Sequence, residues 1–224
     1  MSNGTILFAL TSHDQLGATG RPTGAYAPEI AHPAQVFRSA GYDLAFVSVQ
    51  GGRVPLDGVK PDDTVTQDFL AEPAVSQALA ATPRAADLDP GDYAAVFFAG
   101  GHGTMWDFPD ATDLAELAAA VYERGGVVAA VCHGPAALVN LRLSDGSLLV
   151  EGKRVSSFTD SEEDAVGLAG VVPFLLQRTL EQRGGKHEQA DDFTELAVSD
   201  RRLVTGQNPA SAARVAELTV EALR

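Results

Sequence analysis

Short apolar runs alternate with amphipathic segments along most of this 224-residue chain. Between several of the runs, apolar residues recur with a spacing near 3.6, which predicts helices at 28–40, 110–124, 134–142, 163–183 and 208–223. The runs themselves predict strands at Thr5–Leu10, Leu44–Val49, Ala94–Ala99, Val127–Val131, Arg154–Ser157, Leu196–Val198 and Leu203–Thr205. This alternation predicts an α/β fold with a mostly parallel sheet, in which ligands bind beyond the carboxyl ends of the strands.

The chain is long enough to bury a substantial core, and we expect a single domain spanning residues 1–224. Its content of 45% apolar and 21% charged residues argues against long disordered stretches. The segments 50–64 and 82–92 are rich in Pro and Asp and are interpreted as surface loops rather than linkers.

Charge and cysteine content narrow the classes of partner. The net charge of −14, from 30 acidic and 16 basic residues, disfavours binding to nucleic acid or to anionic membranes. A single cysteine excludes an internal disulfide framework, and no paired Cys/His spacing predicts a metal site, so we expect a cytoplasmic protein. The apolar run Ile6–Leu10 is too short for a signal peptide or a membrane span and predicts a first strand.

Cys132 lies between the apolar run Val127–Val131 and a segment that begins Gly134-Pro135 and continues with good helix formers. Small residues on both sides of the cysteine suit a sharp turn from strand to helix, in which a nucleophile is exposed at the end of a sheet. The positive end of a helix dipole and the adjacent His133 would lower the pKa of the thiol. The alternative is that Cys132 is a small buried apolar residue, as most free cysteines are.

Other polar groups follow the predicted strands. The turn Gly100–Gly103 could direct the backbone N–H of Gly101, together with that of His133, at a developing oxyanion, or it could be an ordinary turn. A third group that orients His133 would come from the acidic stretch 158–164, which also resembles a helix N-terminus. Glu29 lies at a predicted helix start, where most glutamates only complement the helix dipole.

Five groups of motif residues occur together in this chain, and the combination is specific for one protein family. They are Thr23-Gly24-Ala25-Tyr26 with Glu29 and His32-Pro33, Ala99-Gly100-Gly101-His102-Gly103, Val131-Cys132-His133-Gly134-Pro135, Phe158-Thr159 with Glu162-Glu163, and Thr205-Gly206-Gln207-Asn208-Pro209-Ala210-Ser211. With these motifs the chain resembles the DJ-1/PfpI superfamily over nearly its whole length, and within it the Hsp31-like class of glutathione-independent glyoxalases.

The resemblance implies a flavodoxin-like three-layer sandwich, that is, one class I glutamine amidotransferase-like domain with helices on both faces of the sheet. It implies that Cys132 is the nucleophile, His133 its partner, and Glu163 the acidic third member, although Glu162 is an alternative for that role. It also implies that Glu29 lies against the sulfur and transfers protons. A carboxyl in an apolar pocket beside a thiolate should have a raised pKa.

The activity implied is that of a glyoxalase III-type lyase without cofactor or metal, which converts a 2-oxoaldehyde such as methylglyoxal to lactate. Thiolate attack would give a hemithioacetal, and proton transfer by His133 or Glu29 would lead through an enediol to a thioester that water cleaves. The alternatives are a stress-response holdase chaperone, a Cys132 redox sensor, a protein deglycase and an amide hydrolase. The resemblance also implies a homodimer.

Overall fold

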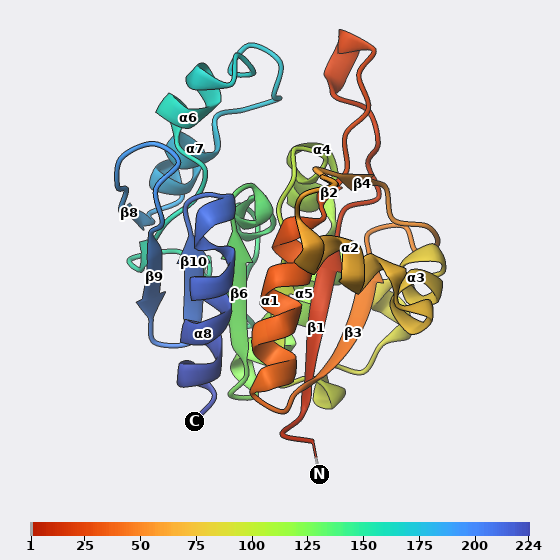
Figure 1. The fold of residues 1–224 in the computed structure, drawn as a ribbon. Coiled ribbons are helices and arrows are strands. Elements are labelled where there is room, and N and C mark those ends of the chain that lie inside the picture. The colour runs from red at the N-terminus through yellow and green to blue at the C-terminus, as the bar shows by residue number, and fades with distance from the viewer. Residues whose placement is uncertain (1) are drawn as a thin grey trace.

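The computed structural model describes residues 2–224 and has a mostly parallel six-stranded sheet at its centre (Figure 1). The strand order is β3-β1-β5-β6-β10-β9, and only β9 runs antiparallel to its neighbour. Two pairs of short strands, β2 with β4 and β7 with β8, lie outside this sheet. The strands are β1 (Thr5–Leu10), β2 (Ala25–Tyr26), β3 (Asp43–Ser48), β4 (Leu56–Asp57), β5 (Ala95–Phe98), β6 (Val127–Val131), β7 (Arg154–Val155), β8 (Lys186–His187), β9 (Ala197–Asp200) and β10 (Leu203–Gly206).

Helices cover both faces of the sheet, with α1 and α8 side by side on one face and α5 on the other (Figure 1). The helices are α1 (Pro28–Ser39), α2 (Thr64–Ala71), α3 (Pro73–Ala80), α4 (Thr104–Asp107), α5 (Thr112–Glu123), α6 (Asp160–Ala165), α7 (Leu176–Gln182) and α8 (Ala212–Ala222). Short 3-10 helices span Gly17–Thr19, Ala85–Asp87, Pro90–Asp92, Phe108–Asp110, Gly134–Leu138 and Pro209–Ser211. The predicted α/β sandwich is therefore confirmed.

The apolar runs are continuous because both faces of the central strands are buried. In β6, Val127, Ala129 and Val131 face the core formed with α1 and α8, whereas Val128 and Ala130 face the core formed with α5. Successive side chains of a strand point to opposite faces, so a strand between two helical layers needs apolar residues at every position.

The predictions for β1 and β6 match the observed bounds, and those for the other large-sheet strands differ by one or two residues. The short strand β7 ends at Val155, two residues earlier than predicted. Of the segments predicted as loops, 50–64 is mostly irregular but contains β4, whereas 82–92 contains two 3-10 helices, Ala85–Asp87 and Pro90–Asp92. Helices α2, α3 and α4 were not predicted from the sequence. Within residues 2–224, no helix is both long and apolar enough to cross a membrane.

Two helix predictions are wrong in extent. The predicted helix 163–183 is two helices, α6 and α7, because Gly167 adopts φ +73° and Pro173 cannot donate a backbone hydrogen bond. The predicted helix 134–142 is only the 3-10 helix Gly134–Leu138. The cysteine is thus followed by a short 3-10 segment and not by a long α-helix.

The sheet order places the polar turns together. The chain moves from β1 to β3 on one side and then to β5 on the other, so the order reverses at β1. In the paired strands, Phe98 of β5 lies opposite Ala130 of β6, and Val131 lies opposite Gly206 of β10. The turns after these three parallel strands therefore meet at one edge of the sheet, where α/β folds bind ligands.

Candidate active site

Cys132 directly follows β6 and adopts φ +59°, a left-handed conformation that is strained for any residue with a side chain. Its N–H donates to the Gly206 carbonyl at 2.9 Å, and its carbonyl accepts from the Phe158 N–H at 2.8 Å. A Cβ at Gly134 would overlap the Phe98 carbonyl. These contacts fix the sharp turn that the sequence predicts and leave the sulfur at the base of a pocket.

His133 turns back toward the sulfur of the preceding residue. Its Nδ1 lies 3.3 Å from Cys132 Sγ, and its Nε2 lies 2.7 Å from Glu163 Oε2. Burial, and then the nearby His102, lowers the pKa of His133 to about 4, so the ring is neutral near pH 7. The Thr104 hydroxyl also donates to the His133 carbonyl at 3.0 Å.

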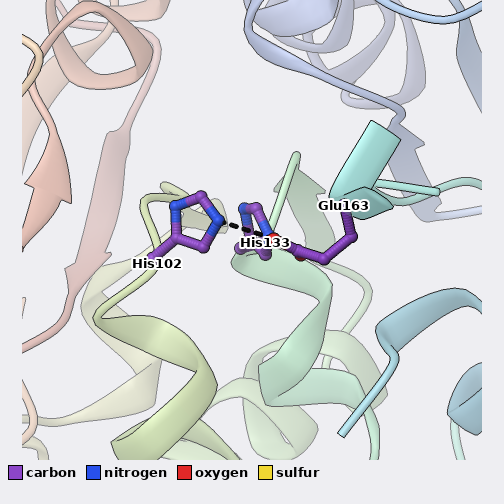
Figure 2. A group of neighbouring side chains, drawn as sticks. All are labelled: His102, His133 and Glu163. Carbon is purple, nitrogen blue, oxygen red and sulfur yellow. Dashed lines mark hydrogen bonds and ion pairs between the residues drawn. The ribbon is translucent and has the colours of Figure 1, made fainter. Parts of the chain in front are cut away.

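Glu163, on α6, accepts hydrogen bonds from two imidazoles (Figure 2). His102 Nε2 lies 2.9 Å from Oε1, and the His102 and His133 rings are 4.1 Å apart. Burial alone would raise the pKa of Glu163, but the hydrogen bonds from the two histidines lower it to about 2. An ionised carboxylate only accepts, so both Nε2 atoms carry hydrogen and His133 Nδ1 is free to accept the thiol proton.

Glu162 faces away from His133 and is buried in a separate network. Its Oε2 accepts from the Thr159 N–H at the start of α6, and its Oε1 accepts from the Phe193 N–H and from the side chains of Gln207 and Asn208. Of the two acidic residues that the sequence left open, Glu163 is the one that contacts His133. Glu162 instead ties the 190–194 segment to the turn after β10.

Glu29, in the first turn of α1, is completely buried beside the cysteine. Its Oε2 accepts from the Gly100 N–H at 2.8 Å, and no partner satisfies its Oε1. The carboxyl is close enough to the thiol for each group to influence the other's pKa. Burial raises the pKa of Glu29 to about 8, although the neighbouring Cys132 thiol and the hydrogen bond from Gly100 act to lower it. The carboxyl therefore exchanges protons near neutral pH.

The thiol itself is not activated as the sequence suggested. Burial, and then the nearby Glu29, raises the pKa of Cys132 well above its ordinary value. The prediction of a lowered pKa was wrong because the expected helix dipole is reduced to a short 3-10 segment, while Cys132 is only 4% exposed. The thiolate must therefore form as its proton passes to a neighbouring acceptor.

These side chains meet in a pocket of about 280 Å³. It is lined by Tyr26, Glu29, Asp57, Gly101, His102, Cys132, His133, Phe158, Val166, Phe193 and Pro209. Larger hollows exist, such as one of about 530 Å³ between α1 and α8, but that hollow contains none of the predicted site residues.

Gly101 lies in this lining with φ +103°. A Cβ there would overlap the Gly24 carbonyl, and a Cβ at Gly100 would overlap the Glu29 carboxylate. The glycines of this turn thus allow Glu29 and the backbone to approach the cysteine.

His102 and the apolar residues Phe158, Val166 and Phe193 line the pocket but were not predicted as site residues from the sequence. Two aromatic side chains that follow the glycine turn pack outside the pocket: Phe108 is buried, and Trp106 stacks on His13. The motif signal for His102 was present in Gly-Gly-His-Gly, but only the fold shows that it reaches Glu163.

His102, His133 and Glu163 also present three ligand atoms that lie within 4.8 Å of one another, as a metal ion would need. In this structure those groups are already paired, because each imidazole donates to one oxygen of the carboxylate. A metal ion could bind there only by replacing both of these hydrogen bonds.

The chain is similar to known proteins over nearly its whole length. The model of the DJ-1/PfpI family matches residues 23–222. Glyoxalase 3 of Candida albicans is 36% identical, with 97% of each chain covered, and the glutathione-independent glyoxalase HSP31 of Saccharomyces cerevisiae is 34% identical, with 98% of each covered.

Solved structures show the same similarity. The crystal structure of glyoxalase III from Candida albicans superimposes with a TM-score of 0.90 at 36% identity, covering 99% of this chain and 98% of that one. The Rapid Encystment Protein of 24 kDa from Francisella tularensis superimposes with a TM-score of 0.95 at 34% identity, covering 99% of each chain.

Proposed function

The chain belongs to the DJ-1/PfpI family, and we propose that it is a glutathione-independent glyoxalase that converts 2-oxoaldehydes such as methylglyoxal to 2-hydroxy acids such as lactate. One observation carries this proposal: Cys132 contacts a proton acceptor, His133, and lies beside a carboxyl with a pKa of about 8, that of Glu29. Thiol addition followed by proton transfer between adjacent carbons needs both groups.

In the first step, Cys132 Sγ attacks the aldehyde carbon while its proton passes to His133 Nδ1, 3.3 Å away. A carbon–sulfur bond forms and the carbonyl π bond breaks, which leaves a hemithioacetal oxyanion. The backbone N–H groups of Gly101 and His133 stabilise this oxyanion, and Glu163 stabilises the imidazolium through its 2.7 Å contact with Nε2.

In the second step, Glu29 as a carboxylate removes the proton from the former aldehyde carbon. The electron pair forms the double bond of an enediolate, and the ketone oxygen takes the proton held by His133. Glu29 then returns its proton to the second carbon, and the oxyanion closes to a thioester. Glu29 and His133 thereby regain their initial protonation states.

In the last step, water activated by His133 attacks the thioester, the carbon–sulfur bond breaks, and the sulfur recovers its proton. The net reaction adds one water to a 2-oxoaldehyde and gives a 2-hydroxy acid. The chemistry consumes no cofactor, because the aldehyde carbon is oxidised as the ketone carbon is reduced.

One domain carries the whole site, since α1, the turns after β5 and β6, and α6 all contribute to it. We further propose a homodimer in the cytoplasm, where reducing conditions keep Cys132 a free thiol.

The alternative function of a holdase chaperone is less well supported. Residues 2–224 expose only three large apolar side chains, Val59, Val166 and Phe193, so they present no broad apolar surface that could bind unfolded proteins.

The test is loss of methylglyoxal in thiol-free buffer without glutathione, with D- and L-lactate assayed for the wild type, Cys132→Ala and Glu29→Gln. We expect lactate from the wild type, none from Cys132→Ala, and a rate lowered at least about a hundredfold in Glu29→Gln. Wild-type protein that forms no lactate while Cys132 still reacts with iodoacetamide would contradict the proposal and favour a redox role.

A further inference from the structure

An apolar rim lines one side of the pocket, and the proton-transfer chemistry does not use it. Phe158, Val166, Phe193 and Pro209 form this rim. Val166 is 43% exposed and Phe193 is 49% exposed, and with Val59 they are the large apolar side chains exposed in residues 2–224. Two of these three thus gather at the mouth of one pocket, where an apolar ligand group would cover them.

Phe193 is held at the mouth in a strained conformation. Its φ of +59° is uncommon for a bulky side chain, and such strain persists only where the surroundings enforce it. The enforcing contact is the Phe193 N–H, which donates to the buried Glu162 Oε1 at 2.7 Å. The Phe193 ring lies 6.2 Å from that of Phe158, which in turn lies 4.4 Å from the imidazole of His133.

This line of rings leads from the reacting groups to solvent. Methylglyoxal has only a methyl group beyond its two carbonyls and therefore carries no ring that could pack against these aromatic side chains. The pocket volume of about 280 Å³ approaches that of sites for drug-sized ligands. Aromatic side chains, moreover, bind other rings by offset or edge-to-face packing.

We propose that Phe158, Val166 and Phe193 form a subsite for the substituent of the 2-oxoaldehyde, and that the preferred substrates carry an aryl or extended alkyl group in place of methyl. This inference rests on the proposed glyoxalase function and specifies its substrate class. Phe193 determines specificity through its ring, and Glu162 acts as a positioning residue through the Phe193 N–H.

The experiment compares kcat/KM for phenylglyoxal with kcat/KM for methylglyoxal. In the wild type we expect phenylglyoxal to be favoured at least about tenfold, since even one methylene in an apolar pocket changes selectivity by about that factor. In Phe193→Asn the ratio should fall about tenfold. Asn tolerates a positive φ, so this variant removes the ring without forcing the backbone to change.

Two control variants separate the ring from other effects. Arg201 has φ +58° at the amino end of β10, at the edge of the sheet opposite Cys132, so Arg201→Asn relieves similar strain away from the pocket. Val59 is 46% exposed and outside the pocket lining, so Val59→Asn removes an exposed apolar side chain elsewhere. Both controls should leave the ratio unchanged.

A binding readout is independent of turnover. Mandelate, the product from phenylglyoxal, should protect Cys132 from iodoacetamide at concentrations at least about tenfold lower than lactate does, and Phe193→Asn should remove this difference. Equal protection by the two acids, or a substrate ratio that is unchanged in Phe193→Asn, would overturn the subsite. If neither aldehyde reacts, the glyoxalase function fails, while the protection experiment still decides whether the apolar subsite exists.

Discussion

Glu29 shows how a group suited to proton transfer opposes folding. Its carboxyl is fully buried, and its pKa is about 8 rather than the ordinary 4.5. The folded state therefore binds this proton more tightly than the unfolded state does. The stabilisation is complete below about pH 4.5 and is lost as pH rises toward 8, because only the unfolded chain then ionises freely.

We predict that Glu29→Gln, which cannot ionise, is more stable than the wild type at high pH. The difference in unfolding free energy should be small near pH 4.5 and reach several kcal/mol above pH 8, since one pKa unit corresponds to about 1.4 kcal/mol. Urea denaturation across this pH range measures it. A difference that stays constant with pH would show that Glu29 has the same pKa in the folded and the unfolded protein.

The same pKa predicts how activity depends on pH. Because Glu29 acts as a carboxylate when it removes the carbon-bound proton, kcat/KM for methylglyoxal should rise with pH up to about 8. The measurement is a pH–rate profile of the wild type and of Glu29→Gln, and the rise of kcat/KM with pH should be absent in the variant. Activity that is level or falling through that range would assign the proton transfer to another group.

His102, His133 and Glu163 predict the effect of metal ions. Catalysis needs His133 Nδ1 and the hydrogen bond between His133 and Glu163, so chelation by EDTA should leave activity unchanged, whereas Zn²⁺ should inhibit by binding the three side chains. His102→Gln should weaken zinc inhibition by about tenfold or more. Loss of activity on chelation, restored by Zn²⁺, would instead make the cluster a resident metal site.

At the scale of residues, Cys132 could be found from local pattern because strand, turn and small neighbours are adjacent in sequence. Glu29 could not, because its role depends on α1 bringing it beneath a turn 71 residues away, and only the family resemblance pointed to it. Phe193 gave no signal either. Its position depends on a hydrogen bond to Glu162, 31 residues earlier in the chain.

At the scale of elements, the turn after β5 determines how closely Glu29 approaches the cysteine. A Cβ at Gly100 would overlap Glu29 Oε2 and lie 2.7 Å from the Val131 carbonyl. We predict that Gly100→Ala lowers kcat/KM at least about a hundredfold and destabilises the fold by about 1–3 kcal/mol. Steady-state kinetics and thermal unfolding measure the two effects.

Gly170 provides the matched control, because a Cβ there has no heavy atom within 4 Å and its φ is not positive. Gly170→Ala should keep full activity and an equal or slightly higher melting temperature. If Gly100→Ala were as active as Gly170→Ala, the close packing of Glu29 against this turn would not matter for the reaction.

The elements also show what sequence periodicity can predict. Buried strands such as β1 and β6 are marked by unbroken apolar runs, and α1 and α5 by regular amphipathic spacing. The segment 163–183 has similar spacing, but its glycines and Pro173 divide it into α6 and α7. Periodicity reports which residues face the core, whereas a helix also needs an unbroken series of backbone hydrogen bonds.

At the scale of the whole molecule, the net charge of −14 acts differently on substrate and product. A 2-oxoaldehyde is neutral, so the protein's field neither attracts nor repels it. The product is an anion, formed in a pocket whose lining residue His133 is hydrogen-bonded to the ionised Glu163. The overall field therefore favours the departure of the 2-hydroxy acid from the site.

This difference predicts a selective effect of salt. Raising ionic strength from about 0.01 M to 0.15 M shortens the Debye length from about 30 Å to 8 Å, which screens the repulsion between the protein and the product anion. Inhibition by added lactate or mandelate should strengthen roughly two- to fivefold, while kcat/KM for the neutral aldehyde stays constant. Measuring both constants in the same salt series separates electrostatics from general effects of salt on the enzyme. If the inhibition constant of the product and kcat/KM for the aldehyde depended equally on salt, the charged surface would have no influence at the pocket. Local contacts alone would then govern product release.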